Sequence, residues 1–243
     1  MSTRTPLSHP VRVIPPQPDI PETLRTAVID ALRWAWSRLR EETTVDPMNA
    51  GEEEITNEIE DLLNQQPKGR RRAHMLRLFG KVVRSGQQRS AGASFRQSPD
   101  LTFQPKSTPR EVTHIGEWGL FAECKIVEPT SDHSPGVYCR DGVARFVDGR
   151  YAKSMSSGLM VAYVRDGRHP FATLKSLLGN AIVRAHPTDI DLLYTIHDRS
   201  MVDPPCVTIE LAHVWLDARL QPAAGETVPS TTAKTLDRPA GAG

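Results

Sequence analysis

Two charged residues near the middle of the chain have the types and spacing of side chains that do chemistry. In the apolar segment GLFAECKIVE (119–128), Glu123 and Lys125 stand two positions apart. Side chains alternate between the two faces of a β-strand, so both charges would lie on one face and Cys124 on the other. A carboxylate and an ammonium among apolar neighbours are costly unless they are paired or bind an ion. The alternative to a functional pair is a structural salt bridge at a strand end.

Asp100 is placed to join this pair. It follows Pro99 in SPDLTF, a turn-favouring context, and precedes the β-like run of residues 101–103. If that run pairs with residues 120–127, Asp100 and Glu123 converge at one end of a sheet. Two carboxylates are hard oxygen ligands of the kind that hold Mg²⁺, which also accepts phosphate oxygens. With a lysine to orient or deprotonate a water and offset charge on the phosphate, the set predicts phosphodiester hydrolysis.

The PD dipeptide ending at Asp100, followed by the ECK tripeptide at 123–125, resembles the PD-(D/E)xK signature of the restriction-endonuclease-like nuclease superfamily. The resemblance covers roughly residues 50–165. It implies a four-stranded mixed sheet flanked by helices, entered from an N-terminal helix that often contributes another acidic residue. The alternative is a chance match, or a catalytically inactive module of the same fold that binds nucleic acid or a partner protein.

The resemblance also implies roles for individual residues. Asp100 and Glu123 would bind Mg²⁺, or Mn²⁺ in its place, together with the backbone carbonyl of Cys124. Lys125 would serve the attacking water. The expected activity is that of a hydrolase, a metal-dependent DNA endonuclease acting on duplex DNA.

An acidic helix and basic segments are expected around this centre. In the helix predicted over residues 51–66, Glu58 lies between the apolar positions of the helical wheel and can face a metal, with Glu54 as the alternative third acid. Clustered basic side chains neutralise a phosphate backbone, although a solvated surface is the alternative reading of any charge run. The candidate substrate contacts are Arg70, Arg71 and Arg72 in the basic stretch 67–96, and Arg145, Tyr151 and Lys153 after the ECK strand.

The elements that must position these residues follow from hydrophobic periodicity. Residues 21–42 carry apolar side chains at helical spacing, which predicts an amphipathic helix before the acidic one. The wholly apolar run 157–164 predicts a strand covered on both faces. Further helical segments are expected within 134–155 and 170–182, and further strands within 191–199 and 206–218. This order predicts an α/β fold with a central mixed β-sheet flanked by helices, a restriction-endonuclease-like core.

Composition bounds the remaining organisation. Residues 1–20 read as a flexible proline-rich arm, 21–220 as the nuclease domain, and 221–243 as a disordered tail. The chain has 30 Lys and Arg against 29 Asp and Glu, so net charge alone points to no partner. The three cysteines lack ligand spacing, and a zinc site at His186, His197 and His213 is the less favoured alternative for the histidines.

The expected setting and partners are those of an intracellular nuclease. With no signal peptide and no membrane-spanning run, we expect a cytoplasmic protein that does not contact the membrane. Cutting both strands of a duplex calls for two active sites, which favours a homo-oligomer. Because no target-reading domain is evident, partner proteins are expected to supply specificity or activation, as in a bacterial restriction or anti-phage defence system.

Overall fold

The computed structural model describes residues 16–65, 77–84, 98–130, 132–167, 171–179, 181–202 and 206–219. The expected C-terminal tail and residues 1–15 of the expected N-terminal arm lie outside these ranges. Arg70, Arg71 and Arg72 also lie outside the described residues.

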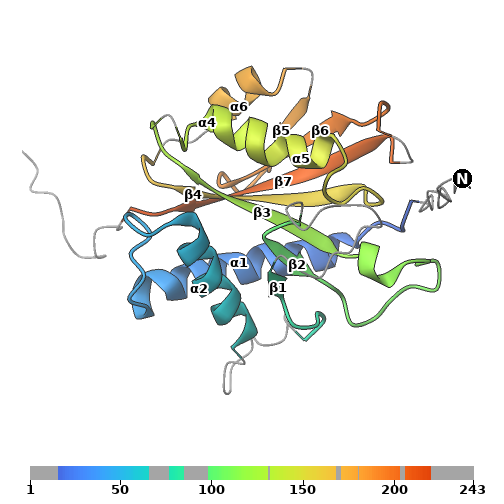
Figure 1. Ribbon diagram of the computed structural model, residues 1–243, viewed down its shortest axis with the longest axis horizontal. Helices are drawn as coiled ribbons and strands as arrows, with labels where there is room; N and C mark the ends of the chain where they lie inside the picture. Colours follow the sequence, from blue (N-terminus) through green and yellow to red (C-terminus); the bar gives the residue numbers. More distant parts are fainter. Residues whose placement is uncertain are drawn as a thin grey trace, which may run out of the picture.

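A seven-stranded mixed sheet forms the centre of the molecule, in the order β1-β2-β3-β4-β7-β6-β5 (Figure 1). The strands are β1 (Val83–Arg84), β2 (Leu101–Phe103), β3 (Leu120–Val127), β4 (Ser157–Val164), β5 (Ile182–Ala185), β6 (Leu192–Asp198) and β7 (Thr208–Asp217). The three long central strands β3, β4 and β7 run parallel, and antiparallel strands extend the sheet on both sides. The α/β class expected from the sequence is therefore confirmed.

Helices cover both faces of this sheet (Figure 1). On one face lie α1 (Glu22–Glu42) and α2 (Glu52–Asn64), as the sequence predicts. On the other face lie α6 (Phe171–Leu177) and one helical segment made of α4 (Pro135–Val137), the π-helical turn η2 (Tyr138–Val143) and α5 (Ala144–Val147). A short 3-10 turn, η1 (Ile115–Glu117), precedes β3. No helix in the described part of the chain is both long and apolar enough to cross a bilayer.

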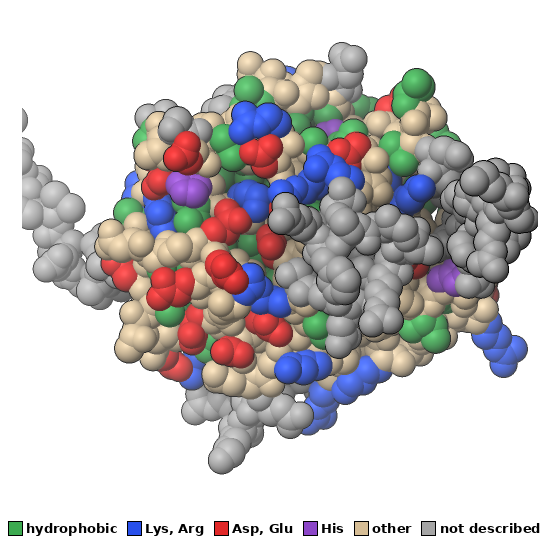
Figure 2. All heavy atoms as spheres, in the orientation of Figure 1, with side chains coloured by type: hydrophobic (Ala, Val, Ile, Leu, Met, Phe, Trp, Pro, Cys, Tyr) green, Lys and Arg blue, Asp and Glu red, His purple; other side chains and the backbone are tan. Residues whose placement is uncertain are grey.

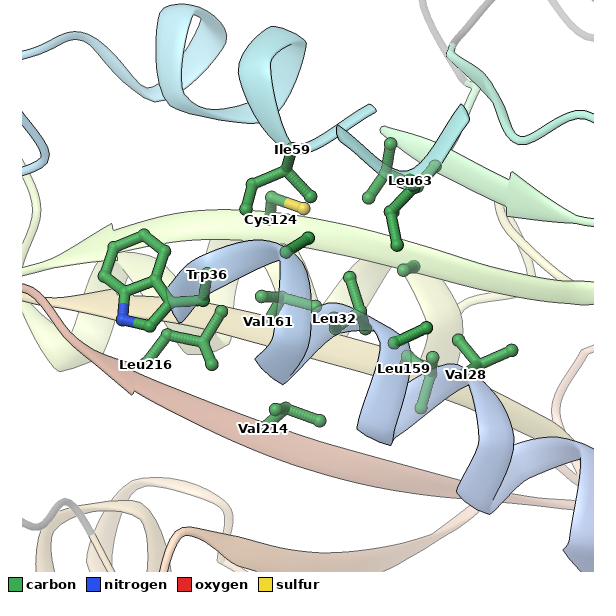
Figure 3. Packing of buried hydrophobic residues seen from close by; sticks show 14 of the residues in the cluster. Val28, Leu32, Trp36, Ile59, Leu63, Cys124, Leu159, Val161, Val214 and Leu216 are labelled. Carbon is green, nitrogen blue, oxygen red and sulfur yellow. The ribbon is translucent and has the colours of Figure 1, made fainter. Parts of the chain in front are cut away.

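The apolar stripe of α1 packs directly on the central strands (Figure 3). Val28, Leu32 and Trp36 lie against Leu159 of β4 and Val214 of β7, and all five side chains are buried. Burying such side chains contributes about 1.5–3 kcal/mol each. The wholly buried β4 confirms the expectation of a strand covered on both faces, with α1 and α2 on one side and the α4 to α6 helices on the other.

Two strands were not expected from the sequence. The two residues of β1 pair with β2, and β5 pairs with β6 at the opposite edge of the sheet. Neither has an alternating apolar pattern, because the side chains of β1 are half-buried and most of those of β5 are exposed. Edge strands of this kind are fixed by their neighbours' backbone groups, which leave no periodicity in the sequence.

Two of the three candidate zinc histidines lie in a buried hydrogen-bond chain. His213 Nδ1 is 2.7 Å from the Tyr138 hydroxyl, and its Nε2 is 2.8 Å from the Thr195 hydroxyl, which is 2.7 Å from His197 Nε2. His186 lies apart, beside the ring of Tyr194. Both ring nitrogens of His213 are thus engaged by protein groups, which satisfies a buried polar side chain without a metal ion.

This buried hydrogen-bond chain makes the stability of the protein depend on pH. Burial lowers the pKa of His213 to about 3, against 6.5 in an unfolded chain, and lowers that of His197 to about 4. Between the folded and unfolded pKa values of each histidine, the unfolded chain binds a proton that the folded protein does not. The contribution of the two neutral histidines to stability is therefore complete above about pH 6.5 and is lost as pH falls. We expect His213 alone to reduce the free energy of unfolding by about 2 kcal/mol between pH 7 and pH 5. Denaturant titrations at each pH measure this slope.

The matched variants are His213→Gln and His186→Gln. The free energy of unfolding of His213→Gln should depend less on pH than that of the wild type. That of His186→Gln should keep the dependence of the wild type, because His186 is not part of the buried hydrogen-bond chain. Equal slopes in the two variants would contradict the assignment to His213.

Candidate active site

The site is built where β3 loses its neighbour on one side. Strand β2 pairs only with residues 120–122 of β3, with Leu101 opposite Ala122. Beyond that point the N–H groups of Cys124 and Ile126 face the side from which β2 has ended. Carboxylates take the place of the missing carbonyls: Asp100 accepts from the Cys124 N–H at 2.7 Å, and Glu52 accepts from the Ile126 N–H at 3.1 Å. This open edge of β3 brings two acidic side chains to the strand that carries Glu123 and Lys125.

Glu123 and Lys125 form the expected pair on one face of β3. Lys125 Nζ lies 3.0 Å from Glu123 Oε1, and the two side chains are 12% and 0% exposed. The alternate residues of β3, including Cys124, enter the core beneath α1 and α2. Lys125 also donates to Glu52 at 2.7 Å and to the Cys124 carbonyl at 2.9 Å. The lysine therefore links the strand face to the open edge.

A second cation reaches Glu123 from the helical segment after β3. Arg145 of α5 places Nη1 2.5 Å from Glu123 Oε1 and 2.9 Å from the Tyr151 hydroxyl, with its guanidinium 5.7 Å from the centre of the Tyr151 ring. The π-helical turn η2 precedes α5, and such turns are frequent at functional sites. The structure thus brings two of the predicted substrate contacts, Arg145 and Tyr151, to Glu123.

Close packing brings α5 over the strands. A Cβ on Gly158 of β4 would lie 2.7 Å from the ring of Phe146, the residue after Arg145. A Cβ on Gly142 in η2 would lie 2.5 Å from the end of Met160 and 3.6 Å from Cγ of Lys125. The absence of a side chain at both positions allows the helical segment to approach β3 and β4, which positions Arg145 beside Glu123.

The acidic groups dominate the electrostatics of the site. Burial, helped by the nearby Asp100 carboxylate, raises the pKa of Glu123 to about 8, against the opposing effects of Lys125 and Arg145. Burial also raises the pKa of Asp100. Burial acts to lower the pKa of Lys125, but the surrounding carboxylates, Glu123 first among them, hold it above its ordinary value. The lysine is therefore protonated, and the site would gain from a further cation.

Two other predicted residues lie away from this centre. Lys153 is exposed; burial raises the pKa of Glu117, and Lys153 acts to lower it. Glu58 is half-buried on α2, and none of its hydrogen bonds or ion pairs in the described structure joins it to the site. The α2 carboxylate that contacts Lys125 is Glu52, so the structure favours Glu52 over Glu58, and over the exposed Glu54, as the acidic contribution of this helix.

The structure and the helical wheel point to different glutamates because Glu52 lies at the N-terminus of α2. The helical wheel favours Glu58 because this residue borders the apolar stripe of α2. Glu52 instead opens α2, directly after Gly51, and from there its side chain reaches the edge of the sheet. An acidic residue in the first turn of a helix is a common feature, so its presence in the sequence could not by itself mark Glu52.

Asp100 and Glu123 have the chemistry of a cation site. Glu123 Oε2 is buried and has no hydrogen-bond partner among the residues that the structure describes, although its other oxygen binds Lys125 and Arg145. A buried carboxylate oxygen with no partner is costly, and a cation would satisfy it. Among the described residues, no group of three or more His, Cys, Asp or Glu side chains is arranged to hold a metal ion. Any cation here would rest on two carboxylates, a carbonyl and water.

Comparisons with protein-family models, with curated proteins and with solved structures find no match to this chain.

Paired substitutions distinguish the role of Glu52 from that of Glu58. We expect Glu52→Gln to lower the free energy of unfolding by about 1–3 kcal/mol, because it leaves Lys125 with one partner fewer in a mostly buried setting. We expect Glu58→Gln to change it by less than about 0.5 kcal/mol. Urea titrations of both variants at pH 7 measure the difference, and equal losses would argue against the position given to Glu52.

The raised pKa of Glu123 predicts a second dependence on pH, opposite in sign to that of the histidines. Its folded pKa of about 8 exceeds the unfolded value of 4.5, so the folded protein holds a proton that the unfolded chain releases. That contribution is present at low pH and is lost as pH rises through about 8, by about 2 kcal/mol between pH 6 and pH 8. Urea titrations in EDTA should show the loss in the wild type and not in Glu123→Gln; a slope unchanged by the substitution would contradict it.

Proposed function

We propose that this protein is a metal-dependent nuclease that hydrolyses phosphodiester bonds, as the resemblance to PD-(D/E)xK nucleases implies. The observation that carries the proposal is the convergence of Asp100, Glu123 and Lys125 at the open edge of β3, with Glu123 Oε2 buried and without a partner among the described residues. A purely structural salt bridge would explain Lys125 beside Glu123. It would not explain the buried carboxylate oxygen to which no described residue donates a hydrogen bond.

The order of elements around the site supports the same proposal. Helix α2 is followed by the antiparallel strands β1, β2 and β3, then by the α4 to α5 helical segment, then by β4 parallel to β3. This is a four-stranded mixed unit entered from an acidic helix, which is what the resemblance implies. The remaining strands β7, β6 and β5 extend the sheet from the far side of β4.

Each residue of the site has a chemical task in this proposal. Asp100 and Glu123 would hold Mg²⁺ or Mn²⁺, with the Cys124 carbonyl on the same edge. When bound, such a cation acts as a Lewis acid on a phosphoryl oxygen and acidifies a bound water. Lys125, whose pKa the surrounding carboxylates hold above its ordinary value in the metal-free protein, would orient the attacking water and offset negative charge at the phosphate.

The distribution of charge favours approach of the substrate from one side. Acidic side chains gather over α2, while Lys and Arg side chains are interspersed with acidic ones over the neighbouring α4 to α5 region (Figure 2). A phosphate backbone is repelled more strongly by the first surface than by the second. Arg145, which reaches the site from α5, is the basic residue best placed to meet the scissile phosphate, and Tyr151 supports it.

Cleavage assays test this function. Purified protein is incubated with supercoiled plasmid and with linear duplex DNA in Mg²⁺, Mn²⁺ or EDTA, beside Glu123→Gln and Lys125→Met. We expect cutting that requires the metal and falls about 100-fold or more in both variants, because each loses a group that acts on the phosphate or its metal. The controls Glu54→Gln and Lys175→Met remove exposed charges of the same kind outside the site and should cut like the wild type.

Cleavage that persists in EDTA, or in both Glu123→Gln and Lys125→Met, would contradict the proposal. If no variant cuts, and duplex DNA binds equally well to the wild type and to Glu123→Gln, the chain is better described as a non-catalytic binding module.

A further inference from the structure

Arg145 contacts the same carboxylate that the proposed metal needs. Glu123 Oε1 receives both Arg145 Nη1 at 2.5 Å and Lys125 Nζ at 3.0 Å, although its side chain is fully buried. A guanidinium cannot lose its charge by deprotonation in a protein, so Arg145 can relieve crowding of positive charge at Glu123 only by moving. A divalent cation bound to Glu123 would be placed next to that charge.

Of the two cations at Glu123, Arg145 is the one able to leave. Lys125 stands on a central strand, is 12% exposed, and has three oxygen partners in Glu52, Glu123 and the Cys124 carbonyl. Arg145 is 31% exposed and uses one nitrogen, Nη1, for both of its partners. Its Nε and Nη2 bind no described residue and are not among the buried atoms that lack a partner. These N–H groups are therefore not fully buried and can accept a new partner.

The net charge of the site explains why Arg145 would leave Glu123 when a cation binds. With all three carboxylates ionised, as binding of a cation requires, Asp100, Glu123 and Glu52 together with Lys125 and Arg145 leave one net negative charge. A divalent cation added with Arg145 in place would leave a net positive charge in a mostly buried site. With Arg145 withdrawn, the same addition would leave the site neutral. Burial favours the neutral arrangement.

We propose that Arg145 competes with the divalent cation for Glu123, and that transfer of its guanidinium to a substrate phosphate couples cation binding to substrate binding. The inference rests on the proposed nuclease function and adds a regulatory role to one of its residues. A planar guanidinium with two unused nitrogens, Nε and Nη2, matches the oxygens of a phosphodiester. Because such coupling is reciprocal, the phosphate substrate strengthens cation binding and the cation strengthens substrate binding. The cation is then held firmly only when nucleic acid is present.

Binding of Mn²⁺ in the absence of nucleic acid tests the competition without any cleavage. The full chain is titrated with Mn²⁺ and the unbound ion is measured by electron paramagnetic resonance, for the wild type and for Arg145→Gln, which retains an N–H donor and loses the charge. We expect Arg145→Gln to bind Mn²⁺ about 10-fold or more tightly than the wild type. Arg150→Gln is the matched control, since Arg150 pairs with Asp148 at the surface and should leave the affinity within about 2-fold.

A second titration measures the coupling on the wild type itself. A phosphorothioate duplex oligonucleotide, which resists cleavage, should raise the affinity of the wild type for Mn²⁺ and should leave that of Arg145→Gln nearly unchanged. This measurement compares each protein with itself, so a loss of stability in the variant does not imitate the result. Circular dichroism at each step verifies that both proteins are folded.

The outcomes separate this inference from the function on which it rests. Equal Mn²⁺ affinity in the wild type and Arg145→Gln, with binding abolished in Glu123→Gln, would overturn the role of Arg145. The same result would still support Glu123 as a ligand of the metal. No Mn²⁺ binding by any of the proteins, with or without the duplex, would overturn both.

Discussion

The end of the β2–β3 ladder is the constraint on which the rest of the site depends. Once β2 stops opposite Ala122, the N–H groups of Cys124 and Ile126 need other acceptors, because a buried backbone donor without a partner is costly. Asp100 and Glu52 supply those acceptors, one from the residue before β2 and one from the start of α2. Both carboxylates are therefore held beside Lys125 by the same hydrogen bonds that complete the backbone of β3.

This arrangement concentrates negative charge where the fold can least solvate it. Glu123 is buried on the strand face, and its pKa is raised even with two cations in contact. Natural proteins tolerate such unfavourable groups mainly where they bind or react with something. The helices above the sheet reinforce the crowding, since the glycines of η2 and β4 let α5 bring Arg145 against Glu123.

Much of this architecture could be predicted from the sequence because it follows from periodicity. The helical spacing of residues 21–42, the apolar run of β4 and the alternation around Glu123 each specify one element and one orientation. The turn before Leu101 predicts the start of β2, and the structure shows the pairing with β3 on which the convergence of Asp100 and Glu123 depends. These signals are local, and the structure agrees with them.

The parts that could not be predicted depend on contacts between distant segments. Glu52 was missed because its role depends on where the first turn of α2 meets the sheet edge, which helical periodicity does not encode. The contact of Arg145 with Glu123 needs the π-helical turn and two close packing positions, and none of these has a sequence pattern as clear as an amphipathic stripe. Edge strands β1 and β5 carry no alternation that would mark them.

The spacing of the site along the chain also has a consequence for the order of folding. The ion pair of Lys125 with Glu52 closes a separation of 73 positions, whereas Asp100 lies 24 positions from Cys124 and Arg145 lies 22 from Glu123. Contacts between distant segments form late, because the entropy of closing a long loop must be overcome first. The β2–β3 hairpin and the helical segment after it are thus able to assemble around Glu123 before α2 docks. Lys125 would form its ion pair with Glu52 only when α2 packs against the sheet. Docking of α2 is therefore the step that completes the site.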